Sequence, residues 1–269
     1  MNNFDILKNK FTRIGARLKV SDGSDRRTRA VAAVALDVRS DGKGEFFEVI
    51  HRPDAQVQVE VLDVRPSDRH LLLLVREREA KSKFLCGHDE RHWFVAAIPE
   101  AAPVGTVLSA KEALKPALVR EAQARERLRP DVHNRRKNSA YRRQGEWFFI
   151  PRSDLRVDEN RVLRNEPITR GNGGKPHWCD FCYRTGGETV HVNRQHPNGI
   201  LESEYRQLIE RQPETRKEVW RVMRRNALVY VRGRVRHADH ATITLPGWHR
   251  VLMNTENESK AMINVAFLD

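Results

Sequence analysis

Apolar and polar residues alternate through much of the first hundred residues. Residues 57–64 (VQVEVLDV) carry valine at nearly every second position, which predicts a strand with one buried and one solvated side. Residues 70–78 (HLLLLVRER) form an apolar run beside it, and residues 27–40 and 45–51 flank the turn SDGKG. The pattern predicts an N-terminal antiparallel meander.

Helical periodicity is confined to short stretches. Residues 1–20 predict a short, basic, amphipathic helix. An S-x-x-E spacing opens the segment 109–129 and predicts a capped helix, with a kink or a later start at Pro116. Two more helices are expected over residues 202–212 and 214–225.

Period-two patterns return in the second half of the chain. Strands are expected over residues 146–151 (EWFFIP), 188–192 (ETVHV) and 227–237. Residues 241–254 would return as the second strand of a terminal β-hairpin, and residues 263–269 would add an edge strand.

These elements predict an α+β, β-rich fold in two parts. Residues 1–128 would form a β-meander domain with a following helix, and residues 146–269 a mixed C-terminal domain. Residues 129–145 between them are polar, basic and unpatterned, which is typical of a linker or an exposed arm. Residues 152–185 are expected to be rich in loops.

Charge narrows the choice of partner. The 269 residues include 49 Lys and Arg against 36 Asp and Glu, a net charge of +13. Such a balance favours a polyanion: nucleic acid, an anionic membrane or an acidic protein. The 39% of hydrophobic residues is too high for a disordered chain.

The same composition indicates a cellular compartment. The N-terminal stretch lacks the apolar core of a secretory signal, and no run approaches the roughly 18 apolar residues of a membrane span. Three cysteines do not make a disulfide framework. We expect a cytoplasmic protein without a transmembrane segment.

The excess charge falls in two stretches. Residues 120–145 hold nine basic and three acidic residues, and residues 216–236 hold eight basic residues and one acidic residue. In the second stretch Arg232, Arg234 and Arg236 alternate with small or apolar residues, so a strand would present all three on one face. Tyr230 shares their parity and could stack on a base. The other expected nucleic-acid-binding residues are Arg135, Arg136, Lys137, Arg142, Arg143, Arg224 and Arg225.

Two of the three cysteines lie in the run WCDFC. His177-x-Cys179-x-x-Cys182 supplies three of the four ligands of a structural zinc site, and His191 or the remote Cys86 could supply the fourth. A redox pair would need a strand before the first thiol and a helix after it, and the flanking glycines do not favour that. A zinc site, a redox pair and simple packing of two thiols all stay open, with packing favoured.

Histidines form further candidate sites. His237, His240 and His249 follow the arginine-rich strand, and His88 and His92 precede an earlier strand. They could serve in general acid–base or metal-dependent catalysis if they meet a carboxylate. The glycine-rich segment from Arg170 to Lys175 could cradle a phosphate, although it lacks the spacing of a P-loop.

Three functions are compatible with these features. The leading hypothesis is a nucleic-acid-binding protein that prefers RNA or single-stranded DNA and contacts mostly phosphates. The second is a metal-dependent nuclease or phosphodiesterase that uses the histidines. The third is an interaction module that docks an acidic protein.

Overall fold

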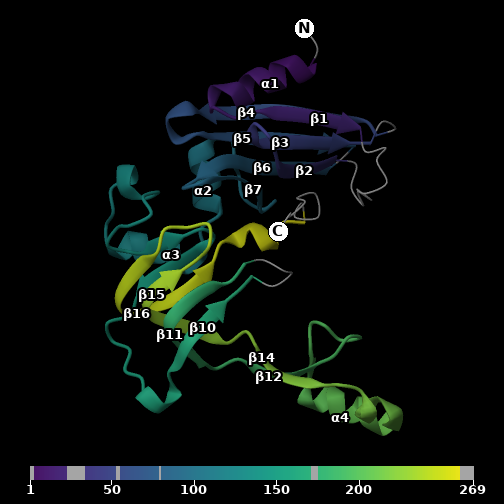
Figure 1. Ribbon diagram of the computed structural model, residues 1–269, viewed down its shortest axis with the longest axis vertical. Helices are drawn as coiled ribbons and strands as arrows, with labels where there is room; N and C mark the ends of the chain where they lie inside the picture. The colour runs from purple at the N-terminus through teal and green to yellow at the C-terminus, as the bar shows by residue number, and fades with distance from the viewer. Residues whose placement is uncertain (1–2, 23–33, 53–54, 79, 171–174, 261–269) are drawn as a thin grey trace.

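The protein folds into two β-rich halves, from the second of which an arm projects (Figure 1). The computed structural model describes residues 3–22, 34–52, 55–78, 80–170 and 175–260. It is an α+β structure dominated by antiparallel sheets, with one parallel strand pair, so the predicted fold class is confirmed.

Two sheets and a helix form the N-terminal half. The elements are α1 (Asn3–Arg13), β1 (Leu18–Asp22), β2 (Val34–Asp41), β3 (Gly44–His51), β4 (Val57–Arg65), β5 (His70–Glu77), β6 (Ala80–Asp89) and β7 (His92–Ile98). The first sheet has the order β1-β3-β2, in which β1 pairs with β3 in parallel. The second sheet is the predicted antiparallel meander β4-β5-β6-β7.

The apolar run of β5 is explained by burial on both sides. Leu71 and Leu73 face a core shared with α1 and the first sheet. Leu72 faces the opposite core, which α2 (Val107–Ala113) covers. A strand with no solvated side needs apolar residues at consecutive positions. In the half-buried strand β4, by contrast, apolar and polar residues alternate.

The single helix expected over residues 109–129 is instead two helices. Its first part, α2, is capped by Thr106, whose hydroxyl accepts from the Ser109 N–H at 3.1 Å. Its second part, α3 (Ala117–Arg125), starts directly after Pro116. Proline has no N–H to continue the hydrogen-bonding of α2, so the chain turns there.

One antiparallel sheet forms the body of the C-terminal half. Its strands, in spatial order, are β10 (Leu163–Ile168), β11 (His177–Thr185), β15 (Leu228–Arg236), β16 (Ile243–Met253), β9 (Trp147–Pro151) and β8 (Arg142–Gln144). The expected terminal hairpin is β15–β16. Strands β10 and β11 lie within residues 152–185, so the expected loop region contributes two strands.

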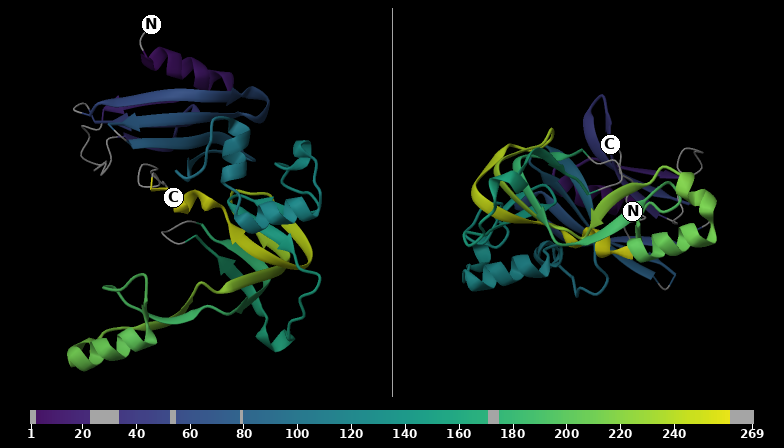
Figure 2. Two further views of the ribbon diagram at one scale, coloured as in Figure 1. Left: turned by 180° about the vertical axis from the view of Figure 1, so that it is seen from behind. Right: turned by 90° about the horizontal axis from the view of Figure 1, so that it is seen from below.

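The arm consists of a small sheet and a helix, and it extends away from both halves (Figure 2). It contains β12 (Glu188–Val192), β13 (Ile200–Leu201), α4 (Glu202–Arg211) and β14 (Arg221–Arg225). The prediction of a helix over residues 214–225 is therefore wrong, because residues 221–225 pair with β12.

The described residues also contain short 3-10 helices. These are Pro66–Asp68, Pro130–Val132, Glu159–Arg161, Pro213–Lys217 and Thr255–Glu258.

Contacts between the halves involve the segment expected to be a linker. The Arg136 guanidinium lies between the carboxylates of Asp89 and Glu90 at the end of β6. Tyr141 is 1% exposed and packs beside Phe148. Residues 129–145 are thus largely built into the structure, and their last residues form strand β8 rather than an exposed arm.

Some expectations fall on residues outside the described ranges. These are the edge strand over residues 263–269, the first part of the strand over residues 27–40, and the glycine-rich residues 171–174. Within the described ranges, the longest and most apolar helices are still too short and too polar to span a membrane.

Truncation of Leu73 tests the doubly packed sheet. Leu73 is fully buried, so Leu73→Ala leaves a cavity and is expected to lower the free energy of unfolding by about 2–5 kcal/mol. Leu118→Ala on α3, where the leucine is 42% exposed, is the matched control and should change stability by less than about 1 kcal/mol. Urea unfolding followed by circular dichroism measures both; equal losses would contradict this packing.

Candidate functional site

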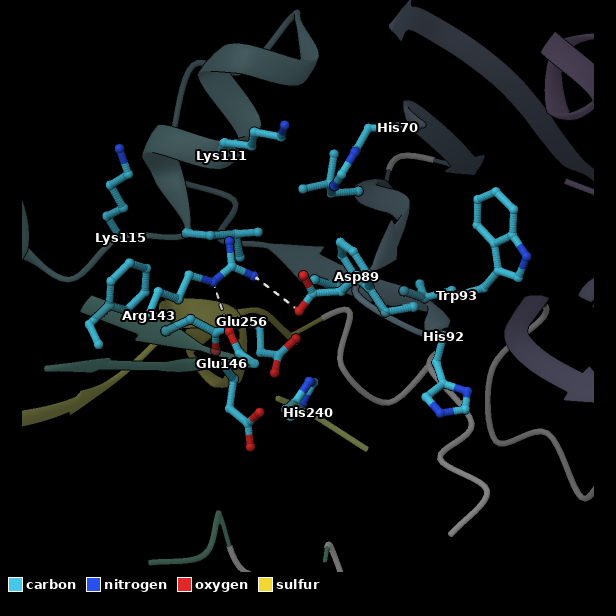
Figure 3. Close-up of a pocket in the computed structure, with 18 of the residues that line it drawn as sticks. His70, Asp89, His92, Trp93, Lys111, Lys115, Arg143, Glu146, His240 and Glu256 are labelled. Atoms are coloured by element: carbon cyan, nitrogen blue, oxygen red, sulfur yellow. Dashed lines mark hydrogen bonds and ion pairs between the residues drawn. The ribbon is translucent and has the colours of Figure 1, made fainter. Parts of the chain in front are cut away.

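A cavity of about 260 Å³ lies where the two halves meet. Strands β6 and β7 and helix α2 line it from the N-terminal side, and β8, β9 and the chain after β16 line it from the C-terminal side. Figure 3 draws 18 of its residues and labels His70, Asp89, His92, Trp93, Lys111, Lys115, Arg143, Glu146, His240 and Glu256. The lining is unusually rich in charged groups for an enclosed space.

Arg143 occupies the floor of this cavity. Its Nε donates to the Gly145 carbonyl at 2.7 Å, and its terminal nitrogen lies 3.9 Å from Asp89 (Figure 3). Burial lowers the pKa of Arg143, but a guanidinium keeps its charge at any physiological pH. Arg143, predicted to bind nucleic acid, thus lies half-buried in the lining of this cavity rather than on an open face.

Two more buried charges flank the cavity. Lys115 is 2% exposed and donates to Glu112 at 2.6 Å and to the His133 carbonyl at 2.9 Å. Glu256 is 3% exposed and pairs with Arg170 at 2.7 Å. Burial raises the pKa of Glu256 and lowers that of Lys115, since a low dielectric disfavours both charges.

Three histidines converge at the edge of the cavity. Trp178 of β11 is paired with Arg236 of β15, which brings the neighbouring His177 against the turn that carries His237 and His240. One ring nitrogen from each histidine lies within 4.8 Å of the other two. The imidazoles of His177 and His237 are stacked with ring centres 4.1 Å apart.

Burial disfavours the charged form of two of these histidines. Burial first, and the neighbouring imidazoles second, lower the pKa of His177 to about 3. The pKa of His240 is also lowered, mainly by burial. His240 lines the cavity as well, so the cluster and the cavity are adjacent.

The cysteines do not join this cluster. Cys179 and Cys182 are fully buried in the core of the C-terminal sheet, and Cys86 is buried in the N-terminal half. Burial raises the pKa of Cys179 to about 12 and of Cys182 to about 11, so neither is a reactive thiolate. The predicted grouping of His177 with these thiols is replaced by its grouping with two histidines.

The remaining candidate histidines are dispersed. His249 is buried with its Nδ1 2.7 Å from the Gly247 carbonyl, and His191 contacts Glu202 in the arm. His88 packs edge-on against Trp93, and His92 contacts Glu45 at 2.6 Å. Among the described residues, the convergent set of metal-binding side chains is His177, His237 and His240.

The arginines of β15 that were predicted to share a face lie on the side of the C-terminal sheet opposite its buried core. Val231 and Val235 are buried in the core, whereas Arg232, Arg234 and Arg236 keep part of their surface in solvent. Each of the three contacts a polar partner: Arg232 pairs with Glu159, and both Arg234 and Arg236 pair with Asp180.

Aromatic rings lie beside these arginines on the same face. Cross-strand pairing forms one row from Arg164 through Phe181 to Arg232 and another from Tyr183 through Tyr230 to Arg250. Guanidinium groups lie over four of these rings, at the following distances from the guanidinium carbon to the ring centre. Arg232 lies 4.8 Å from Phe181 and 5.0 Å from Trp248, and Arg164, on the other strand that pairs with β11, lies 5.1 Å from Phe181. Arg161 lies 5.0 Å from Tyr183, and Arg250 lies 6.0 Å from Tyr230. Five such contacts on one sheet far exceed the usual density of about one per 70–80 residues.

The other predicted basic residues lie elsewhere. Arg135 forms an ion pair with Asp131. Arg142 lies on edge strand β8, and its backbone forms an isolated β-bridge with that of Lys137. Arg224 and Arg225 lie on the arm. Arg170 lines the cavity, and Lys175 pairs with Asp239 at 3.0 Å. The predicted set is thus divided among several surfaces.

Sequence reasoning missed the cavity residues Lys111 and Lys115, and the arginines 161, 164 and 250. A lysine within an apolar helix pattern is a weak signal, and nothing local shows that it is enclosed. The arginines of the sheet face are recognisable only once the strand register is known.

Comparison with protein-family models, with curated protein sequences and with solved structures gives no match.

Acid sensitivity tests the buried environment of the cavity. Burial lowers the pKa of His70 to about 4 from an ordinary value of about 6.5. Between these values the unfolded chain takes up a proton that the folded protein does not, so His70 should destabilise the fold as pH falls, by up to about 1.4 kcal/mol per pH unit. His70→Gln is expected to flatten the pH dependence of urea unfolding over that range, and an unchanged slope would contradict it.

Proposed function

We propose that this protein binds single-stranded nucleic acid, RNA or single-stranded DNA, on the open face of its C-terminal sheet. One observation carries the proposal: the aromatic rings of Phe181, Tyr183, Tyr230 and Trp248 lie on that face with guanidinium groups over them. Helix α3 covers the β9 side of the same face, where Phe148 and Ile150 are buried against it, whereas Phe181 and Trp248 keep part of their surface in solvent.

Rings and guanidinium groups together suit unpaired bases. A base can stack on the outer side of a guanidinium plane or displace it from the aromatic ring, and either contact tolerates any base. Paired bases in a duplex keep their faces stacked on one another, so they do not offer this surface. The arrangement therefore favours single strands with weak sequence specificity.

Charge on this face is only partly neutralised. Within the described residues, no carboxylate lies within 4.0 Å of the guanidinium groups of Arg161, Arg164 or Arg250. These three arginines are available for phosphates, and their positive charge adds to the +13 of the chain.

The paired arginines can also contribute. Arg232 and Arg234 lie in ion pairs whose carboxylates are at or near the surface. Exposed pairs of this kind contribute roughly 0–1 kcal/mol, so exchanging a carboxylate for a phosphate costs little. The contribution of each is expected to be smaller than that of an unpaired arginine.

A cytoplasmic setting is part of the proposal. All three cysteines are buried as free thiols, as suits a reducing compartment in which RNA is also abundant. An acidic protein would be attracted by the same charge, but it would not need aromatic rings beneath the guanidinium groups, of which Phe181 and Trp248 keep part of their surface in solvent.

Removal of three arginines from the face tests this function. The variant Arg161→Ala, Arg164→Ala, Arg250→Ala is expected to bind fluorescent oligouridylate and oligothymidylate about 10–100-fold more weakly, because these are the arginines without a carboxylate partner among the described residues. The slope of log affinity against log salt should fall by about 2, because three phosphate contacts of about 0.7 each are lost. Fluorescence anisotropy at several salt concentrations measures both quantities.

A matched variant distinguishes binding by this face of the sheet from attraction by the overall positive charge of the chain. Arg120→Ala, Arg125→Ala, Arg129→Ala removes the same charge from exposed positions on and after α3 and should leave affinity within about threefold. Equal losses in the two variants would contradict a specific face. Tighter binding of polyglutamate than of either oligonucleotide would instead identify an acidic protein as the partner.

A further inference from the structure

The histidine cluster contains buried polar atoms that no described protein group satisfies. His177 is 1% exposed, and neither of its ring nitrogens has a hydrogen-bond partner in the described part of the chain. The Nδ1 of His240 is also buried without one. Each unsatisfied buried polar group costs about 1–3 kcal/mol, so groups that converge in this way normally have a ligand.

We propose that His177, His237 and His240 bind a divalent transition-metal ion of the zinc class. All three side chains offer imidazole nitrogen, which suits zinc, copper, nickel or iron, whereas magnesium and calcium prefer oxygen. The site was not apparent from sequence spacing because its members come from β11 and from the turn between β15 and β16. It does not depend on the nucleic-acid-binding function.

The ligand nitrogens are close together, but the rings must turn to bind one ion. The three nitrogens lie within 4.8 Å of one another, and tetrahedral zinc with bonds of about 2.05 Å separates its ligands by about 3.3 Å. The lone pair of an imidazole nitrogen lies in the plane of the ring, so binding requires rotations about the χ angles that bring the three stacked rings to face one point.

Neighbouring groups can orient the ligands. The Nε2 of His237 lies 3.3 Å from the Lys175 carbonyl, so this nitrogen carries the proton and Nδ1 keeps a lone pair. That lone pair accepts from the Asp239 N–H at 3.1 Å, a bond that the ion would replace. A carboxylate oxygen of Glu90 lies 3.8 Å from the Nδ1 of His240, beyond hydrogen-bond distance, and places negative charge beside the cluster.

Three protein ligands leave a coordination position open. Structural zinc sites use four protein ligands, whereas sites with three keep a place for water or a substrate group. Because His240 also lines the cavity between the halves, the open position would be near that cavity. The cluster therefore fits an exchangeable site better than a structural one.

Zinc binding by the whole protein tests the site directly. The protein is dialysed against chelator, and zinc is then titrated in competition with a chromophoric chelator. We expect one equivalent to bind, and His177→Gln, His237→Gln and His240→Gln each to weaken binding by at least about 100-fold. No bound zinc, or wild-type affinity in the three variants, would overturn the proposal.

The cobalt complex distinguishes imidazole from thiolate ligands without any substitution. Cobalt bound to the wild-type chain should show visible d–d absorption and no thiolate-to-cobalt charge-transfer band; such a band would assign the ion to the cysteines instead and overturn the proposal. Cys179→Ala and His196→Gln, the latter in the arm, are matched controls and should bind zinc as the wild type does. Circular dichroism of every variant separates a lost ligand from a lost fold.

Discussion

The pairing of β11 with β15 is the constraint on which the C-terminal half depends. Cys179 and Cys182 are three residues apart, so a regular strand would place them on opposite faces of the sheet. Both are nevertheless buried in the same core, and the pairing of β11 with β15 is irregular between Cys179 and Phe181. The extra residue on β15 requires Gly233, whose φ is 82° and whose missing Cβ would lie 2.9 Å from Asp180.

This one irregularity determines what each side of the sheet carries. It directs Phe181 and Tyr183 to the open face, where they meet Arg232 and Tyr230 across the strand pair. Beyond it, the regular pairing of Trp178 with Arg236 places His177 beside the turn that contains His237. The aromatic face and the histidine cluster are therefore separate features held by the same two strands.

The charged groups enclosed between the two halves depend on their polar partners. Arg143, Lys115 and Glu256 each find an opposite charge or a carbonyl nearby, so the cost of desolvating them is partly offset. Removing one partner of such a pair leaves the other uncompensated, which makes the arrangement sensitive to small changes. A cavity lined in this way holds its polar groups in fixed directions, as a selective ligand site requires.

The sequence by itself determined the fold class, the meander, the terminal hairpin and the alternation of arginine with buried residues on β15. These follow from the period of two along a strand and from apolar runs, which are local properties of the chain. The break at Pro116 is equally local, although the sequence left open whether it would be a kink or a later start.

Only the tertiary structure decided which residues meet. The histidine cluster joins residues sixty positions apart, the cavity joins both halves, and the rings and guanidinium groups of the open face come from four strands and a preceding turn. The WCDFC run was expected in a loop, and it lies in a central strand because β10 and β15 pair with it on either side. Such contacts depend on strand register and on bulges, which are set by partners distant in the sequence and leave no local pattern.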